Sequence, residues 1–412
     1  MDTTGTSADS IFDRMLDIKV RQAFIERKEN SYNTTEAEIE ELKSFIFSSD
    51  CVRDILRLKE GDFYFDPPRL TRLRKKDSNR RRVVYRFGLH ESIILKLMAF
   101  VLHHYDYLYS DSLYSFRMGK HISEIFRTLK KNDYGSTHWV IKADIKSYGD
   151  YLVPEILTRQ IRQLFEKEDP IFCDFMTFLL ERGCYYNQDL LCQGSTGALS
   201  GCALTNFFEN IYLLDVDVFL MENSSYYCRY ADDIAVFVEK EEDALYLYRI
   251  LEEKFEKLGL FYNKEKTMIL SPGSPFDLLG FRLDNGEYDI AENSMQKIEW
   301  KLTHYARKLV RRQQKGLISA SEASQRMVSR IDGYFFGQQR EEHELCWVDW
   351  AYRVLTRVDS LKRLDACAQE CIRYVGSGGK KTNAKYRVRY KDMRKMGYRT
   401  LVHAFYHGFE RK

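Results

Sequence analysis

Two adjacent carboxylates, Asp232 and Asp233, are the side chains of this sequence best suited to chemistry. Apolar and aromatic residues flank them on both sides across positions 226–238, which predicts a strand, a tight turn and a second strand with the aspartates at the turn. Like charges this close disfavour ionisation unless a cation neutralises them. An ordinary Asp-rich hairpin turn would have the same pattern. A further carboxylate elsewhere in the chain would favour a metal site over such a turn.

Asp144 supplies that further carboxylate. The apolar-rich run over 138–143 predicts a strand that ends at Asp144, where the sequence turns polar. Asp144 and Asp232 are therefore candidates to share metal ions. Because the ligands are oxygens that leave room for water, Mg²⁺ is the expected cofactor.

In this order and spacing, the two segments resemble the catalytic motifs of reverse transcriptases. Tyr-Ala-Asp-Asp at 230–233 resembles the signature hairpin of that family, and Asp-Ile-Lys-Ser-Tyr-Gly-Asp at 144–150 resembles its first catalytic segment. The likeness is strong from about 69 to 281 and looser towards the C-terminus. It implies an RNA-directed DNA polymerase in which two Mg²⁺ ions are held by Asp144, the main-chain carbonyl of Ile145, Asp232 and Asp233.

The same resemblance implies contacts with the incoming nucleotide. Residues 75–82 resemble a fingers hairpin, whose cations would hold the triphosphate, and 197–206 is similar to a substrate-positioning motif. Residues 258–267 are similar to a further motif, whose Lys266 would lie near the leaving pyrophosphate as a catalytic residue. The implied nucleotide-binding residues are Lys75, Arg82, Tyr148, Gly149, Gly197 and Asn206.

Two positions depart from the family pattern. Gly149 stands where the family usually carries Phe or Tyr, whose ring blocks a ribose 2′ hydroxyl. Tyr148 is a poor substitute, because adjacent residues of an extended segment point to opposite faces. We therefore expect either weaker discrimination against ribonucleotides or a void filled by another group. Thr196 stands where the family has Gln, which puts template handling in doubt.

The elements that must position these residues predict an α+β fold. The resemblance implies a right-hand polymerase with fingers, a palm made of an antiparallel sheet backed by helices, and a helical thumb. The expected organisation is an N-terminal helical region (1–66), fingers (67–139), a palm (140–290) with a helical insertion at about 154–190, a thumb (291–375) and a basic tail (376–412).

Composition bounds the partners. The chain has 412 residues and a formal net charge of only +3, so nucleic-acid contacts must come from local clusters of charge. Basic residues on one face of the expected thumb would suit a duplex backbone, and residues 279–281 match the hairpin that grips the primer end in the family. The implied nucleic-acid-binding residues are Gly280, Phe281, Arg307, Arg311 and Arg312.

No signal peptide or membrane span is evident, and the nine cysteines show neither zinc-site nor disulfide spacing. We expect a cytoplasmic protein without a membrane partner. The absence of an evident nuclease or integrase domain resembles bacterial stand-alone enzymes, such as retron, group II intron-like and phage-defence reverse transcriptases. This resemblance implies deoxynucleoside triphosphates as substrates, a structured noncoding RNA partner, a DNA product and a role in antiphage defence.

Other readings of the sequence stay open. A template-independent or protein-templated DNA polymerase would use the same carboxylates to make simple or repetitive DNA, and the residues at 149 and 196 favour it mildly. Glu26, Arg27 and Glu29 on the expected N-terminal helix could then present hydrogen-bonding edges to a base. A nucleic-acid-binding module with a decayed site is a third reading, against which the four catalytic candidates argue. A homo-oligomer or a second defence protein is also open as a partner.

Overall fold

The computed structural model describes residues 10–31, 34–74, 81–194, 197–337, 347–380, 382 and 384–408. The chain divides into two compact units. Unit 1 comprises Met1–Lys120 and Trp139–Leu270, and unit 2 comprises His121–His138 and Ser271–Lys412. Lys75 and Thr196 lie outside the described residues.

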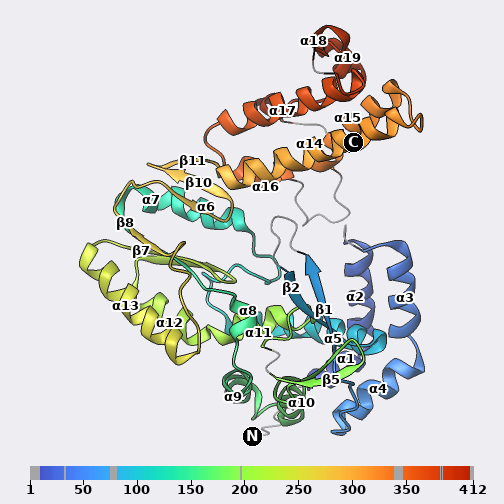
Figure 1. Ribbon diagram of the computed structural model, residues 1–412. Helices are drawn as coiled ribbons and strands as arrows, with labels where there is room; N and C mark the ends of the chain where they lie inside the picture. The colour runs from blue at the N-terminus through green and yellow to red at the C-terminus, as the bar shows by residue number, and fades with distance from the viewer. Residues whose placement is uncertain are drawn as a thin grey trace, which may run out of the picture. The chain divides into compact units, whose positions relative to one another are not determined.

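Unit 1 mixes helices and strands (Figure 1). Its helices are α1 (Ile11–Leu16), α2 (Ile18–Glu29), α3 (Glu36–Ile46), α4 (Ser49–Lys59), α5 (Leu89–Leu102), the 3-10 helix η1 (His103–Leu108), α8 (Tyr148–Tyr151), α9 (Pro154–Phe165), α10 (Pro170–Glu181), α11 (Thr205–Tyr212), α12 (Leu214–Asn223) and α13 (Glu241–Lys257). Its strands are β1 (Arg69–Arg74), β2 (Arg81–Arg86), β3 (Trp139–Asp144), β4 (Cys184–Asn187), β5 (Leu190–Gln193), β6 (Tyr226–Tyr230), β7 (Asp233–Val238) and β8 (Met268–Leu270).

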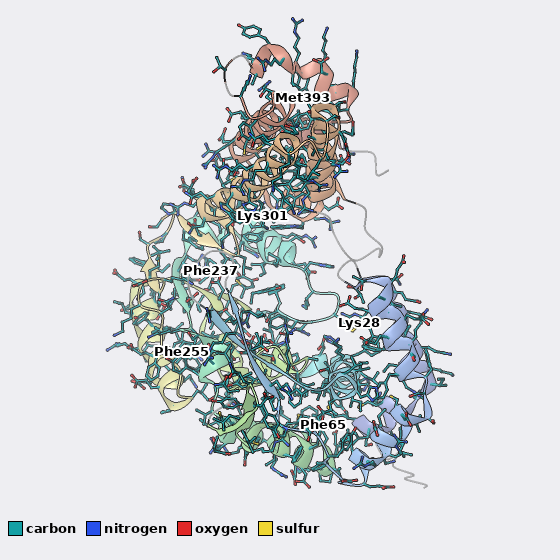
Figure 2. All side chains as sticks on the ribbon, turned by 45° about the vertical axis from the view of Figure 1, so that its right-hand side comes forward. Lys28, Phe65, Phe237, Phe255, Lys301 and Met393 are labelled. Carbon is teal, nitrogen blue, oxygen red and sulfur yellow. The ribbon has the colours of Figure 1, made fainter. Side chains whose placement is uncertain are left out.

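The central sheet of unit 1 has the strand order β6-β7-β3-β8 and is antiparallel throughout. Its strands are almost continuously apolar and are therefore covered by helices. Helix α13 packs on β3, β7 and β8, and α12 packs on β6. Phe255 on α13 and Val236 on β7 belong to one buried core cluster, while Phe237, next to Val236, is buried on the opposite face of the sheet (Figure 2). The antiparallel register pairs Asp144 with Asp233. The predicted strand endings therefore bring the catalytic candidates to one edge.

A second sheet of unit 1 has the order β2-β1-β4-β5. β1 and β2 form an antiparallel hairpin, as the sequence predicts, and the first residue of β1 pairs with β4 in parallel. The hairpin is anchored to the loop before α11, since Tyr85 N–H donates to the Ser200 carbonyl at 2.8 Å. This link fixes β2 relative to α11.

The N-terminal helices are held by caps and by aromatic packing. Thr35 forms a capping box with Glu38 at the start of α3, which satisfies main-chain N–H groups that a helix start leaves unpaired. Phe65 lies in the core against Phe175 of α10, with ring centroids 5.3 Å apart (Figure 2). The Ile11 N–H also donates to the buried Asp169 carboxylate. Helices α1–α4 are thus part of the core of unit 1.

Unit 2 contains a three-stranded antiparallel sheet, in the order β11-β10-β9, and a set of helices. Its strands are β9 (Phe276–Leu278), β10 (Phe281–Asp284) and β11 (Glu287–Ile290). Its helices are α6 (Ile122–Asn132), α7 (Tyr134–Thr137), α14 (Glu292–Gln314), α15 (Ala320–Phe336), α16 (Trp347–Val354), α17 (Asp359–Gly376), α18 (Ala384–Arg387), α19 (Tyr390–Lys395) and α20 (Leu401–His407).

Helices α14, α15 and α17 form the main helical pack of unit 2, to which Lys301 on α14 and Met393 on α19 belong (Figure 2). The apolar faces of α14 and α17 meet, while their basic residues stay at the surface. Within the described ranges, no helix is both long enough and apolar enough to cross a membrane.

The α+β prediction is confirmed, with antiparallel sheets backed by helices. The predicted hairpin at 226–238 and the strand ending at Asp144 are confirmed too. The chain passes between the two units at 120/121, 138/139 and 270/271, so that α6 and α7 belong to unit 2 together with β9–β11. The expected division into fingers, palm and thumb stays a prediction. The ring of Phe126 on α6 packs edge-on against Phe281, a contact across 155 residues that sequence pattern does not reveal.

Candidate active site

The turn between β6 and β7 carries Asp232 directly before Asp233, the first residue of β7. Ala231 adopts a φ of 54°, the left-handed conformation that makes this turn tight. The Asp232 carbonyl accepts a hydrogen bond from Ile145 N–H at 3.3 Å, which joins the turn to the end of β3. The predicted turn therefore presents its carboxylates beside Asp144.

Asp144 is held by the loop that follows α13. Its carboxylate accepts hydrogen bonds from Asn263 Nδ2 at 2.8 Å and from Lys266 Nζ at 3.0 Å, and its main-chain carbonyl accepts one from Asn263 N–H. The Lys266 side chain is 62% exposed, whereas that of Asp144 is 13% exposed. Lys266 therefore places a positive charge on a largely buried carboxylate, at the position where the sequence predicts a metal ion.

The pKa of Asp232 is raised, first by burial and then by the negative charge of Asp144. Across the register, Lys142 Nζ lies 3.7 Å from Asp233 Oδ1. Negative charge is thus concentrated at this edge and is met by protein cations. This is the electrostatic setting in which a divalent cation would bind.

The oxygen donors fit a divalent metal that is also held by its substrates. Within the described ranges, no three or more His, Cys, Asp or Glu side chains form a group able to hold a metal ion. The donor set is instead two carboxylates, Asp144 and Asp232, with the Ile145 carbonyl, to which no group of the described chain donates a hydrogen bond. Such a set leaves coordination positions for phosphate oxygens and water, as Mg²⁺ sites commonly do.

A buried ion pair that the sequence did not reveal supports the catalytic hairpin. Arg229 of β6 donates through Nε to Asp217 Oδ1 at 2.8 Å and through Nη2 to Asp217 Oδ2, and both side chains are almost fully buried. Burial by itself would lower the pKa of Arg229, but the Asp217 carboxylate more than offsets this, so the pKa is raised and the guanidinium stays charged. The guanidinium also donates to the Ala231 carbonyl at 3.4 Å, next to Asp232. Arg229 therefore ties the turn to α12.

The predicted glycine-rich motif reaches the same edge. Gly197 has a φ of +53°, and a Cβ on it would lie 2.7 Å from the Gly149 carbonyl oxygen. Ala198 N–H donates to that same oxygen at 3.0 Å. Only a glycine allows this approach in this conformation. The structure thus brings together Gly149 and Gly197, two residues that lie far apart in the sequence.

The space beside Gly149 is filled by Glu209 of α11. A Cβ on Gly149 would lie 2.8 Å from Glu209 Oε1 and 3.2 Å from Ser200 Oγ. Burial, and then the charge of Asp232, raise the pKa of Glu209 to about 7. The sequence left two possibilities for position 149, weaker discrimination against ribonucleotides or a void filled by another group. In the structure, the Glu209 side chain occupies that space.

Tyr148 does not take the place of the missing ring. Residues 148–151 form the short helix α8, so the prediction that this segment is extended is wrong. The Tyr148 side chain is buried, and its hydroxyl donates to the Glu209 main-chain carbonyl. The structure gives Tyr148 a contact that positions α11 rather than an open face for a nucleotide.

The remaining nucleotide-binding candidates lie at different places in unit 1. Arg82 is an exposed residue of β2 whose charge lowers the pKa of Glu209, so it lies within electrostatic reach of the site. Asn206 is an exposed residue of α11 that lines a cavity of about 390 Å³ together with Arg27 of α2 and Phe100 of α5. Glu26 is exposed on α2.

The predicted nucleic-acid contacts fall in unit 2. Gly280 has a φ of +88° and precedes β10. The Phe281 ring is 1% exposed and packs against Phe126 and Trp350, so this side chain belongs to the core of unit 2. A primer contact at 279–281 stays a prediction for the main chain. Along α14, Arg307 and Arg311 are exposed and one turn apart, whereas Arg312 is half-buried.

Sequence reasoning missed Asn263, Arg229, Asp217 and Glu209. Asn263 lies three residues before Lys266, inside the motif already noted. A charged residue in the apolar run before Tyr230 was the available signal for Arg229, because such a residue inside a buried strand needs a partner. For Glu209 the signal was a single acid between Phe208 and Asn210 in an otherwise neutral helix.

Residues 73–283 match the family model described as "Reverse transcriptase (RNA-dependent DNA polymerase)". This match spans just over half of the chain and contains Asp144, Asp232, Asp233 and Lys266. The chain therefore belongs to the reverse transcriptase family. The family is the one described as RNA-dependent DNA polymerases, and the antiparallel sheets backed by helices fit its right-hand fold.

Solved telomerase structures are among the similar folds. The apo telomerase of Candida tropicalis has a TM-score of 0.46 and 12% identity over 90% of this chain and 67% of that chain. A form of it truncated from the C-terminal domain gives 0.38 and 16% over 55% and 56%. The telomerase of Candida albicans in complex with a TWJ fragment of telomeric RNA gives 0.41 and 11% over 81% and 64%.

This chain thus spans 56% to 67% of the length of these telomerase chains. No curated protein matches it. The family assignment accordingly rests on the matched segment and on the residues that this segment places at one edge of the sheet.

Proposed function

We propose that this protein extends a DNA primer with deoxynucleotides, using RNA as the template. The observation that carries the proposal is the pairing of Asp144 with Asp233 in the central sheet, with Asp232 at the adjoining turn and Lys266 on the Asp144 carboxylate. The family match covers this whole arrangement. Phosphoryl transfer depends on positioning and on neutralising charge, and this edge offers groups for both.

Asp144 and Asp232 would hold Mg²⁺, with the Ile145 carbonyl as a further ligand and Asp233 as an orienting or third carboxylate. When bound, the ions lower the pKa of the primer 3′ hydroxyl and neutralise charge on the reacting phosphates. Asn263 fixes the Asp144 carboxylate through its 2.8 Å hydrogen bond. Lys266, which is largely exposed, would leave Asp144 to donate to the departing pyrophosphate.

The nucleotide would lie between the sheet edge and the fingers hairpin. Arg82 of β2, with Lys75, would neutralise the triphosphate. Gly149, Gly197 and Asn206 would line the remainder of the nucleotide site. In unit 2, Gly280 and the main chain of Phe281 would contact the primer, and Arg307, Arg311 and Arg312 the duplex backbone.

We further propose that the template belongs to a structured noncoding RNA and that the enzyme acts in antiphage defence. The support is the general resemblance to bacterial stand-alone reverse transcriptases, a group that includes retron and phage-defence enzymes, and it is an analogy with the family alone. A homo-oligomer or a second defence protein would be the corresponding protein partner.

The test is nucleotide incorporation by purified protein carrying Asp232→Asn. This change keeps the size of the side chain and removes the charge that would hold the metal, so we expect incorporation to fall at least about 100-fold. The matched control is Asp243→Asn, which removes an exposed acid from the start of α13. Full activity of Asp232→Asn, with melting temperatures equal for all three proteins, would refute the proposal.

A second candidate function is synthesis without a nucleic-acid template. The cavity that Arg27 of α2 shares with Asn206 favours it, because it places a protein side chain able to hydrogen-bond a base beside a nucleotide-binding candidate. Glu26→Ala and Arg27→Ala should then change the sequence of the product rather than its yield. An unchanged product sequence in both variants would remove this candidate.

A further inference from the structure

Glu209 is a buried carboxylate that no described residue holds by a hydrogen bond or a salt bridge. It lies on α11 with 8% of its surface exposed, and among the described residues its side-chain oxygens have no hydrogen-bond donor. A buried ionised group normally has a partner, because an unpaired one loses several kcal/mol of hydration. The partner of Glu209 is therefore to be sought among the molecules that enter the site.

The structure keeps this carboxylate in place from two sides. The Tyr148 hydroxyl donates to the main-chain carbonyl of Glu209, which fixes α11 against α8. Gly149 lies directly beside Oε1, and its φ is not in the left-handed region. The backbone at 149 would therefore accept other residues, and it is contact with Glu209 Oε1, and to a lesser degree with Ser200 Oγ, that disfavours a side chain there.

The charges around Glu209 define which part of a nucleotide it faces. Burial raises the pKa of Glu209, Asp232 and Asp150 raise it further, and Arg82 and Arg229 lower it, so the carboxyl lies within electrostatic reach of both a metal carboxylate and β2. Phosphates would be repelled by the carboxylate and attracted by Arg82 and the metals. The part of a nucleotide that joins its phosphates to its base is the sugar, whose hydroxyls are hydrogen-bond donors.

We propose that the Glu209 carboxylate accepts a hydrogen bond from a sugar hydroxyl of the incoming nucleoside triphosphate and so determines which sugar is incorporated. This inference rests on the proposed function, since it assumes that the nucleotide binds at the Asp144–Asp232 edge. It assigns Glu209 as a specificity-determining residue. The Gly149–Glu209 pair thus places a hydrogen-bond acceptor beside the sugar, where an aromatic ring would only block a hydroxyl sterically.

The experiment compares single-nucleotide incorporation of deoxy-, 2′,3′-dideoxy- and ribonucleoside triphosphates by the wild-type protein, Glu209→Ala and Glu209→Gln. If the hydroxyl is the 3′ group, we expect Glu209→Ala to raise KM for deoxynucleotides about tenfold to 100-fold and to leave dideoxynucleotides unchanged. If it is the 2′ group, Glu209→Ala should raise KM by that factor for ribonucleotides only. Either pattern supports the inference, and the pattern identifies the hydroxyl.

Glu209→Gln keeps the shape of the side chain and should show an intermediate loss, since an amide oxygen is a weaker acceptor than a carboxylate. Glu222→Gln, an exposed position on α12, is the control and should change nothing. A double-mutant cycle adds the geometry: Gly149→Ala should be harmful with Glu209 present and nearly neutral in Glu209→Ala, because the 2.8 Å contact is then gone.

The inference is overturned if Glu209→Ala changes all three sugars by one factor, or if the change follows the base or the Mg²⁺ concentration instead of the sugar. Calorimetric binding of the same triphosphates to the full chain in Ca²⁺ separates this failure from failure of the proposed function. Selective binding without turnover would refute the polymerase and keep the sugar contact. Absence of any nucleotide binding would refute both.

Discussion

At the scale of single residues, the site is a set of carboxylates held in place by their neighbours. Asp144 has two donors from one loop, and Asp232 has its turn fixed through Arg229 and Ile145. The Lys266 ammonium is already paired with Asp144. A divalent cation at this edge would therefore compete with a cation of the chain itself.

Lys266→Met separates the two roles of this lysine. Removing a cation next to Asp144 should leave the affinity for divalent metal equal or higher, because a competing charge is gone. Incorporation should nevertheless fall about 100-fold, since the leaving pyrophosphate loses its donor. Metal affinity is read by terbium luminescence and incorporation by single-turnover kinetics.

Lys264→Met, an exposed neighbour in the same loop, is the control and should behave as wild type. Loss of metal binding in Lys266→Met would mean that the lysine supports the metal site instead of competing with it. Normal incorporation would remove Lys266 from the catalytic set.

Between elements, the β1–β2 hairpin and the loop before α11 meet through two neighbouring contacts. A Cβ on Gly201 would lie 2.3 Å from Val84 Cγ1, and Tyr85 N–H donates to the neighbouring Ser200 carbonyl. Val84 and Arg82 lie on the same face of β2, because side chains alternate along a strand. Gly201 therefore sets how closely the Arg82 face approaches the loop that leads to Glu209.

Gly201→Ala should thus damage activity as well as stability. Gly201 and Gly61 have similar φ angles of +93° and +85°, but a Cβ on Gly61 would meet nothing within 4 Å. Gly61→Ala should cost only the backbone strain, about 1 kcal/mol, and keep full incorporation. Gly201→Ala should cost about 1–3 kcal/mol more and raise KM for the nucleotide. Urea unfolding and steady-state kinetics measure the two effects, and equal behaviour of both variants would refute the contact.

Much of the site was predictable from the sequence, for local reasons. The hairpin around Asp232 and the strand ending at Asp144 follow from apolar runs that break at acids, which is a signal contained in a few neighbouring residues. Glu209 beside Gly149 and Phe126 beside Phe281 were not predictable in this way. Each depends on packing between segments that lie far apart, and the extended conformation expected at Tyr148 failed because α8 is a local helix.

At the scale of the whole molecule, charge is balanced overall and basic only in places. The net charge of +3 gives little general attraction for nucleic acid, so affinity must come from clusters such as the exposed arginines of α14. Arg307 and Arg311 lie one turn apart on this helix in unit 2. If they contact phosphates, they act by releasing counterions and without reading sequence.

Arg307→Ala and Arg311→Ala should therefore weaken binding of an RNA–DNA duplex alike for any sequence. Each should reduce the slope of log K against log salt concentration by about 1, as expected for one lost phosphate contact. Fluorescence anisotropy over a salt series measures the slope. Arg326→Ala on α15, whose guanidinium is paired with Glu322 at 2.6 Å, is the control and should leave the slope unchanged. An unchanged slope in the α14 variants would place the duplex elsewhere.

The most direct test of RNA-directed DNA synthesis is to sequence the DNA that the purified protein makes from all four deoxynucleotides, with and without prior ribonuclease treatment. If RNA is the template, ribonuclease abolishes the product, and the untreated product is complementary to an RNA that copurifies with the protein. Continued synthesis of a simple or repetitive sequence after ribonuclease would contradict an RNA template, because the protein itself would then set the order of nucleotides.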